Sequence, residues 1–147
     1  MEICTMRIWI PRLVMSLSVG LAVAACAGAN AASSDSIVLL EAAPHPGSPL
    51  VAGRQVEIAV TAKYNLQTAD SGTVVLVVQN EQHRPVVVKD QDQAQKDVPR
   101  GMGEVTLTSV VPVKAQFKSV EVYIALISGN KKSTNVTTHF EYPVQQP

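Results

Sequence analysis

Residues 54–66 read Arg-Gln-Val-Glu-Ile-Ala-Val-Thr-Ala-Lys-Tyr-Asn-Leu, and this stretch decides the fold. Apolar side chains occupy every second position: Val56, Ile58, Val60, Ala62 and Tyr64. Most residues between them are polar. A period of two with β-branched side chains is typical of a strand that buries one face, and a helix would need a period near 3.6. The stretch therefore predicts a half-buried β-strand.

Short strand-like segments continue on both sides of this stretch. They cover residues 37–40, 73–78, 85–89, 104–113, 120–128 and 136–142. Turn residues separate them at 69–72, 80–84 and 129–133, and a polar connector with room for one helical turn occupies 90–97. About seven short strands predict an all-β fold, a single Ig-like Greek-key β-sandwich. A small barrel or jelly roll is the alternative.

Two segments resemble parts of a known family. Residues 51–64, in which Gly53 precedes the alternating strand, look like the opening of bacterial exported Ig-like and fibronectin type III-like domains. Residues 120–129, followed by a Ser/Thr-rich last strand, are similar to the final hairpin of those domains. The core Trp and the cysteine pair of antibody domains have no counterpart here. The resemblance implies a β-sandwich with a binding or scaffolding role, and it transfers no catalytic residue.

The N-terminal residues have the pattern of a targeting sequence. Arg7 and Arg12 precede an uncharged run at 13–25, and small residues follow. Basic residues before a short apolar run and a small-residue region are typical of a secretory signal peptide. The run is shorter than the roughly 20 residues that a permanent membrane span needs. We therefore expect an exported protein of the periplasm or cell envelope, or alternatively a secreted one.

Two cleavage points compete in this region. The Ala-Asn-Ala motif at 29–31 would leave a signal peptide of residues 1–31, a flexible tether at 32–36 and the sandwich at 37–147. The Val-Ala-Ala-Cys motif at 23–26 resembles a bacterial lipobox, in which Cys26 would receive a lipid anchor. Both alternatives stay open, and the anchor at Cys26 is the only membrane attachment that we expect.

Composition narrows the function classes. Both cysteines, Cys4 and Cys26, lie in the targeting region, so no disulfide framework supports the domain. The chain has 12 Lys and Arg against 12 Asp and Glu. It has no basic stripe that could neutralise phosphates, so we do not expect a nucleic acid partner.

The body of the chain lacks a catalytic constellation. It contains no Gly-x-Ser-x-Gly elbow and no cysteine nucleophile. His45, His83 and His139 are far apart and lack metal-ligand spacing. We therefore expect no enzyme activity, no metal and no cofactor. Carbohydrate or small-ligand binding is kept as an alternative, although the one tryptophan, Trp9, lies in the signal.

The strands at 73–78 and 120–128 are apolar on both faces, which predicts an interaction surface. If every second side chain of each strand faces the core, the side chains between them face outward on one shared surface. The candidate residues are Val75, Val77, Tyr123, Ile127 and His139, with a rim of Glu121, Thr137 and Glu141. Exposed apolar patches often mark protein interfaces. The sequence therefore predicts a non-catalytic module that binds an envelope protein or a second copy. The alternatives are that these strands are simply rich in β-forming residues, or that the N-terminal segment covers the apolar row.

Overall fold

The computed structural model describes residues 34–86, 94–129 and 136–147, which belong to one compact unit, Ala32–Pro147. Its strands are β1 (Ser36–Ala43), β2 (Leu50–Val51), β3 (Gln55–Asn80), β4 (Gln95–Pro112), β5 (Ser119–Ser128) and β6 (Val136–Gln145). The described residues contain no helix, which confirms the predicted all-β class. Accordingly, no helix within these ranges is long and apolar enough to cross a bilayer.

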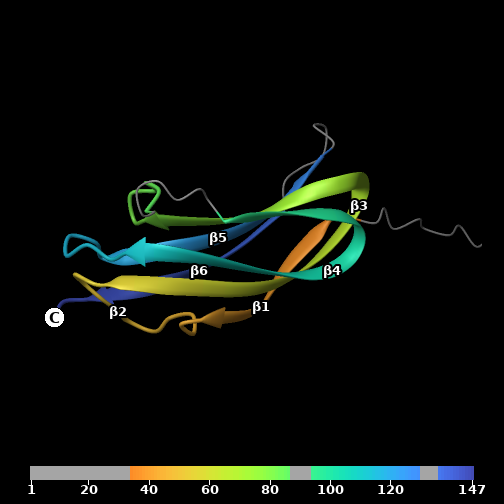
Figure 1. Cartoon of the computed structure of the whole chain (residues 1–147). Coiled ribbons are helices and arrows are strands. Elements are labelled where there is room, and N and C mark those ends of the chain that lie inside the picture. Colours follow the sequence, from red (N-terminus) through yellow and green to blue (C-terminus); the bar gives the residue numbers. More distant parts are fainter. Residues whose placement is uncertain (1–33, 87–93, 130–135) are drawn as a thin grey trace, which may run out of the picture. The chain divides into compact units, whose positions relative to one another are not determined.

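The long strands β3 and β4 build both layers of a β-sandwich. Residues 55–66 of β3 pair with β1 on one side and with residues 101–112 of β4 on the other, and these form layer 1. Residues 71–80 of β3 pair with β5 on one side and with the start of β4 on the other, and these form layer 2. Strand β6 pairs with β5, and β2 pairs with β6, which extends layer 2. Figure 1 shows β3 and β4 curving over together at one end, here named the corner. One folded sheet thus supplies both faces of the core.

Two local irregularities make the corner. The register of β3 against β4 shifts between Leu66 and Ser71. Residues 67–70 of β3 lie opposite the single residue Arg100 of β4, so β3 carries three extra residues at the bend. The inward-facing positions of β4 therefore change from even numbers, as at Val98, to odd numbers, as at Val105. A bulge absorbs such residues, and Gly101 with φ of 111° accepts a conformation that a side chain would strain. The sequence predicted that a turn at 69–72 ends one strand there, which is wrong: the strand bends and continues.

The core follows the predicted alternation. In β3 the row Ile58, Val60, Ala62, Tyr64 is buried, and the row continues past the corner as Val74, Leu76 and Val78. In β5 the inward row is Val120, Val122, Ile124 and Leu126, each 1% exposed or less. A fully buried side chain of this size stabilises the fold by about 1.5–3 kcal/mol. These rows are the main source of stability.

The segment that follows β1 crosses from layer 1 to layer 2. After β1, residues 44–49 leave layer 1, and the amide of Gly47 donates to the carbonyl of Glu141 in β6 at 3.1 Å. β2 then pairs with β6 in parallel. The hydroxyl of Tyr142, a fully buried residue of β6, donates to the carbonyl of Pro44, and burial raises the pKa of Tyr142 to about 12. The crossing segment therefore runs along the edge of β6 that β5 does not occupy.

Several predicted boundaries are corrected. The strand expected at 85–89 is represented only by an isolated bridge between Gln79 and Pro85, and residues 87–93 lie outside the described ranges. β4 begins at Gln95, inside the expected polar connector. The two-residue strand β2, between prolines and glycine, was not predicted. The sandwich therefore has six strands, with β3 replacing two predicted ones.

Asp35 fastens the start of the domain to the corner. It lies in the segment expected to be a tether, yet it is only 9% exposed. Its carboxylate accepts hydrogen bonds from the amides of Gln67 at 2.7 Å and Thr68 at 3.0 Å, and from the Thr68 hydroxyl. Burial alone would raise the pKa of Asp35, but these hydrogen bonds outweigh it and lower the pKa below 3.8.

We expect Asp35→Asn to lower the free energy of unfolding at neutral pH by about 1–2 kcal/mol, because charge-assisted hydrogen bonds are lost. Since the folded pKa is depressed, the contribution of Asp35 is present above pH 3.8 and is lost as the pH falls further. The variant should therefore show a shallower loss of stability in acid. Denaturant titration at several pH values measures both effects.

Asp70→Asn is the matched control. Its side chain is 98% exposed and lies 3.6 Å from Arg100, a surface pair that contributes less than about 0.5 kcal/mol. Equal losses in the two variants would contradict the role given to Asp35.

Candidate interaction face

The outward side of layer 2, here named the outer face, contains every predicted surface residue. Val77 of β3 pairs with Tyr123 of β5, and Tyr123 pairs with His139 of β6, so one row crosses three strands. Next to this row, Val75 pairs with Ala125, and beyond it lies Ile127. Side chains of the same parity on neighbouring strands share one face of a sheet. These residues therefore share one side of layer 2.

The exposure of these residues differs along the face. Ile127 is 39% exposed and His139 is exposed, whereas Val77 and Tyr123 are half-buried. Val75, expected to face solvent, is only 7% exposed. It lies in the centre of the layer between Gln95 and Ala125, and a short side chain in a central strand is covered by its neighbours. The accessible apolar surface is thus narrower than the sequence indicated.

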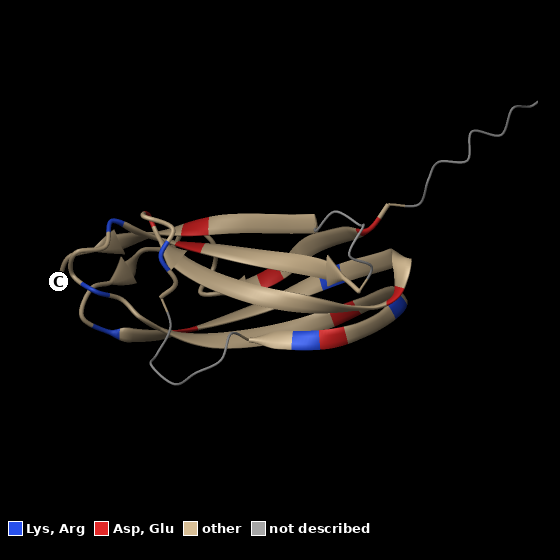
Figure 2. Cartoon of the chain, turned by 90° about the horizontal axis from the view of Figure 1, so that it is seen from above, with Lys and Arg blue, Asp and Glu red and all other residues tan. Residues whose placement is uncertain are grey.

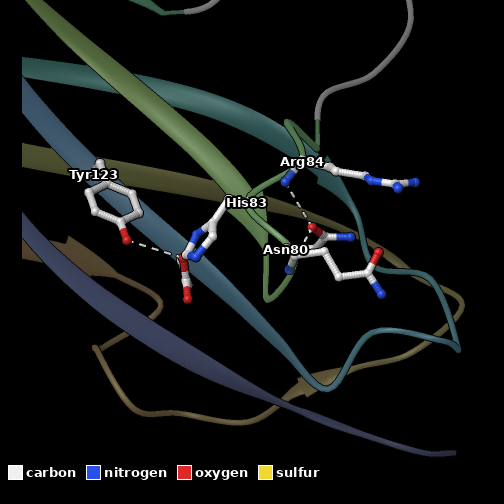
Figure 3. Close-up of polar contacts among 6 residues, drawn as sticks. Asn80, His83, Arg84 and Tyr123 are labelled. Carbon is white, nitrogen blue, oxygen red and sulfur yellow. Dashed lines mark hydrogen bonds and ion pairs between the residues drawn. The ribbon is translucent and has the colours of Figure 1, made fainter.

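A polar cluster borders the apolar row. The Tyr123 ring stacks on the His139 ring, with centroids 5.4 Å apart and an interplanar angle of 20°. The Tyr123 hydroxyl donates to the Glu121 carboxylate at 3.1 Å. The same carboxylate lies 3.2 Å from Nδ1 of His83 (Figure 3). These contacts fix the orientation of the Tyr123 ring on the face.

The turn at 80–84 presents His83 to Glu121. The side-chain oxygen of Asn80 accepts hydrogen bonds from the amides of Gln82 at 3.1 Å and Arg84 at 3.0 Å. The Asn80 carbonyl accepts the amide of His83 at 2.8 Å. His83 has φ of 58°, a left-handed conformation that His tolerates better than most residues. The sequence placed His83 in this turn but did not assign it a contact, because its partner is 38 residues away.

The environment changes the acidity of Tyr123. Partial burial, its hydrogen bond to Glu121 and the negative charge of that carboxylate raise the pKa of Tyr123, and the charge of Glu141 adds to the effect. A hydrogen bond with Gln79 acts in the opposite direction. The tyrosine thus remains a neutral hydrogen-bond donor throughout the physiological range.

The charges of the outer face have one sign. Asp97, Glu121 and Glu141 lie on it, and no Lys or Arg does among the residues that the structure describes. Glu121 and Glu141 are direct cross-strand neighbours. Like charges in that arrangement destabilise a sheet. The repulsion between these two carboxylates therefore lowers the stability of the isolated domain.

Two other expectations concern chemistry and anchoring. Within residues 34–86, 94–129 and 136–147 no three His, Cys, Asp or Glu side chains form a group that could hold a metal ion. Cys26, the lipidation candidate, lies outside the described residues, as does the predicted signal peptide.

The fold and the face define a β-sandwich protein with a half-buried apolar and acidic sheet surface. No family model and no curated protein sequence matches the chain. A conjugative transposon lipoprotein from Bacteroides eggerthii DSM 20697 is similar in structure, with a TM-score of 0.36, 9% identity, and coverage of 74% of this chain and 95% of that chain. The apo form of the Calx CBD1 domain gives a TM-score of 0.40, 10% identity, and coverage of 78% and 99%. Likenesses at these scores carry no argument about function.

We expect Glu121→Gln to lower the pKa of Tyr123, because the neutral amide no longer disfavours the tyrosinate. Partial burial should still keep the pKa above the ordinary value of 10.0. NMR titration of ¹³C-labelled tyrosines resolves this residue from Tyr64 and Tyr142. Glu104→Gln, which removes a carboxylate from the other layer, serves as the control. An unchanged Tyr123 titration in Glu121→Gln would contradict the contact.

Proposed function

We propose that this chain is a non-catalytic exported envelope protein that binds a protein partner through the outer face. The observation that carries the proposal is the row Val77, Tyr123 and His139 across three adjacent strands, continued by Ile127. A row that combines apolar and aromatic side chains with a polar rim has the composition of a protein interface. Tyr123 would be its anchor, since rigid aromatic side chains dominate such contacts.

The charge of the outer face supports a protein rather than a phosphate-bearing partner. Its carboxylates repel nucleic acid and anionic lipid headgroups. The unfavourable pair of Glu121 and Glu141 would be relieved by Lys or Arg side chains of a partner. The partner is an envelope protein or a second copy of this chain.

Export rests on the N-terminal pattern. Arg7 and Arg12 before the uncharged run 13–25 support transport out of the cytoplasm. Cleavage before Cys26 would give a lipid-anchored envelope protein, and cleavage after Ala31 would give a periplasmic or secreted one.

Intact mass of the protein from membrane and soluble fractions of a bacterial host tests export. We expect a chain that begins at Cys26 with acyl groups, or one that begins at Ala32. A full-length mass with Met1 in the cytoplasmic fraction would contradict export.

The alternative, carbohydrate binding, gains no support from the outer face. The Tyr123 ring is half-buried and one of its planes is occupied by His139. On an open sheet face, sugar binding depends on stacking against an accessible aromatic plane.

The interface is tested with Val77→Glu combined with Tyr123→Glu. We expect this variant to bind its partner at least about tenfold more weakly, because buried charges without partners cost several kcal/mol at an interface. A photoreactive residue at position 127, introduced into cells that make the protein, reports the complex as a cross-linked species. Analytical ultracentrifugation distinguishes a second copy from another protein.

The matched control is Ala59→Glu combined with Thr108→Glu, which places two charges on directly paired residues of layer 1. Circular dichroism and thermal unfolding establish that both variants fold. Equal cross-linking in both variants, or no cross-link in the wild type, would refute the proposed interface.

A further inference from the structure

A pocket lies at the end of the sandwich opposite the corner. It has a volume of about 290 Å³ and lies between the turn 80–84 and the loop 112–117. Asn80, Gln82, Arg84, Lys114, Gln116 and Phe117 are among the residues that line it. Figure 3 shows Asn80 and Arg84, which belong to this lining, on the turn. Its volume is near the lower end of ligand sites and suits one sugar ring.

Local hydrogen bonds hold both walls in place. The Asn80 side chain fixes the turn through the amides of Gln82 and Arg84. On the opposite wall, the amide of Phe117 donates to the carbonyl of Lys114 at 3.0 Å, and the Phe117 ring is buried at 6% exposure. A preformed pocket loses little entropy when a ligand binds.

Positive charge gathers around this pocket. Arg84 and Lys114 line it directly, and Lys118 follows Phe117 on the same loop. Arg54 is close, because its carbonyl accepts the amide of Val113 at 2.9 Å. Figure 2 shows Lys and Arg residues gathered at the end that carries the C-terminus. Among the described residues none of these cations takes part in an ion pair. They are therefore available to an anion.

The remaining lining groups favour hydroxyl groups. Gln82 and Gln116 are exposed amides that can donate and accept. Glu81 also lines the pocket, and its carboxylate accepts the amide of Lys118 at 3.4 Å. A carboxylate in the lining disfavours a dianion such as phosphate, but it is a strong acceptor for a sugar hydroxyl.

From this geometry we propose that the pocket binds an acidic sugar unit, a pyranose that carries one carboxylate. Arg84 and Lys114 hold the carboxylate, and a planar guanidinium can form two parallel hydrogen bonds with it. Gln82, Gln116 and Glu81 bind the ring hydroxyls. The site is separate from the outer face, so it does not depend on the proposed protein interface.

The test uses the full-length protein and D-glucuronate as the probe, with calorimetric titration. We expect saturable binding that weakens about tenfold or more in Arg84→Gln combined with Lys114→Gln, because charge-assisted hydrogen bonds are removed. D-glucose, which has the hydroxyls without the carboxylate, should bind at least about tenfold more weakly. Val77→Glu combined with Tyr123→Glu should leave glucuronate binding unchanged.

Lys63→Gln combined with Lys96→Gln removes the same charge from exposed strand positions and is the matched control. Unchanged affinity in this control supports the site. Equal affinity of the wild type and the Arg84/Lys114 variant overturns the proposal, as does an absence of saturable glucuronate binding. Inorganic phosphate that binds more tightly than glucuronate overturns the assignment to a sugar.

Discussion

The antiparallel pairing of β3 with β4 is the constraint on which the rest of the structure depends. It runs from Gln55 with Pro112 to Val75 with Gln95 and continues through the corner. Because the same two strands supply both layers, neither layer can form its core without the other. The inward row of β3 keeps its even-numbered positions across the bend, and the three extra residues of β3 there change the inward-facing positions of β4 from even to odd numbers. A one-residue shift of the β3–β4 register there would turn the inward-facing side chains of half of β4 toward solvent.

The sequence predicted what depends on local alternation. The rows at Ile58 to Tyr64 and Val120 to Leu126 are buried as expected. The pattern Asp-Ser-Gly at 70–72 is compatible with a turn or with a bent strand, and only pairing with a distant segment decides between them. The cover over Val75 and the contact of His83 with Glu121 have the same origin, since both come from residues remote in sequence.

Net charge gave an incomplete account of the surface. Equal numbers of acidic and basic residues indicated no preference for a charged partner. In the folded domain the signs are unevenly distributed: the described part of the outer face has carboxylates without Lys or Arg, while Arg54, Arg84, Lys114 and Lys118 lie around the loop end, where Glu81 is also present. Separation of this kind comes from the register and the loops, because alternation alone does not say which strand ends meet. The two surfaces therefore suit partners of opposite charge.

The turn at 80–84 belongs to both surfaces. Its His83 side chain contacts Glu121 at the edge of the outer face, while Arg84 and Asn80 line the pocket. The Asn80 side chain binds the amides of Gln82 and Arg84, and the Asn80 carbonyl binds the amide of His83, so local hydrogen bonds hold the turn together. The two surfaces thus share this turn but use different side chains of it, which is why a change at Val77 and Tyr123 is compatible with an intact pocket.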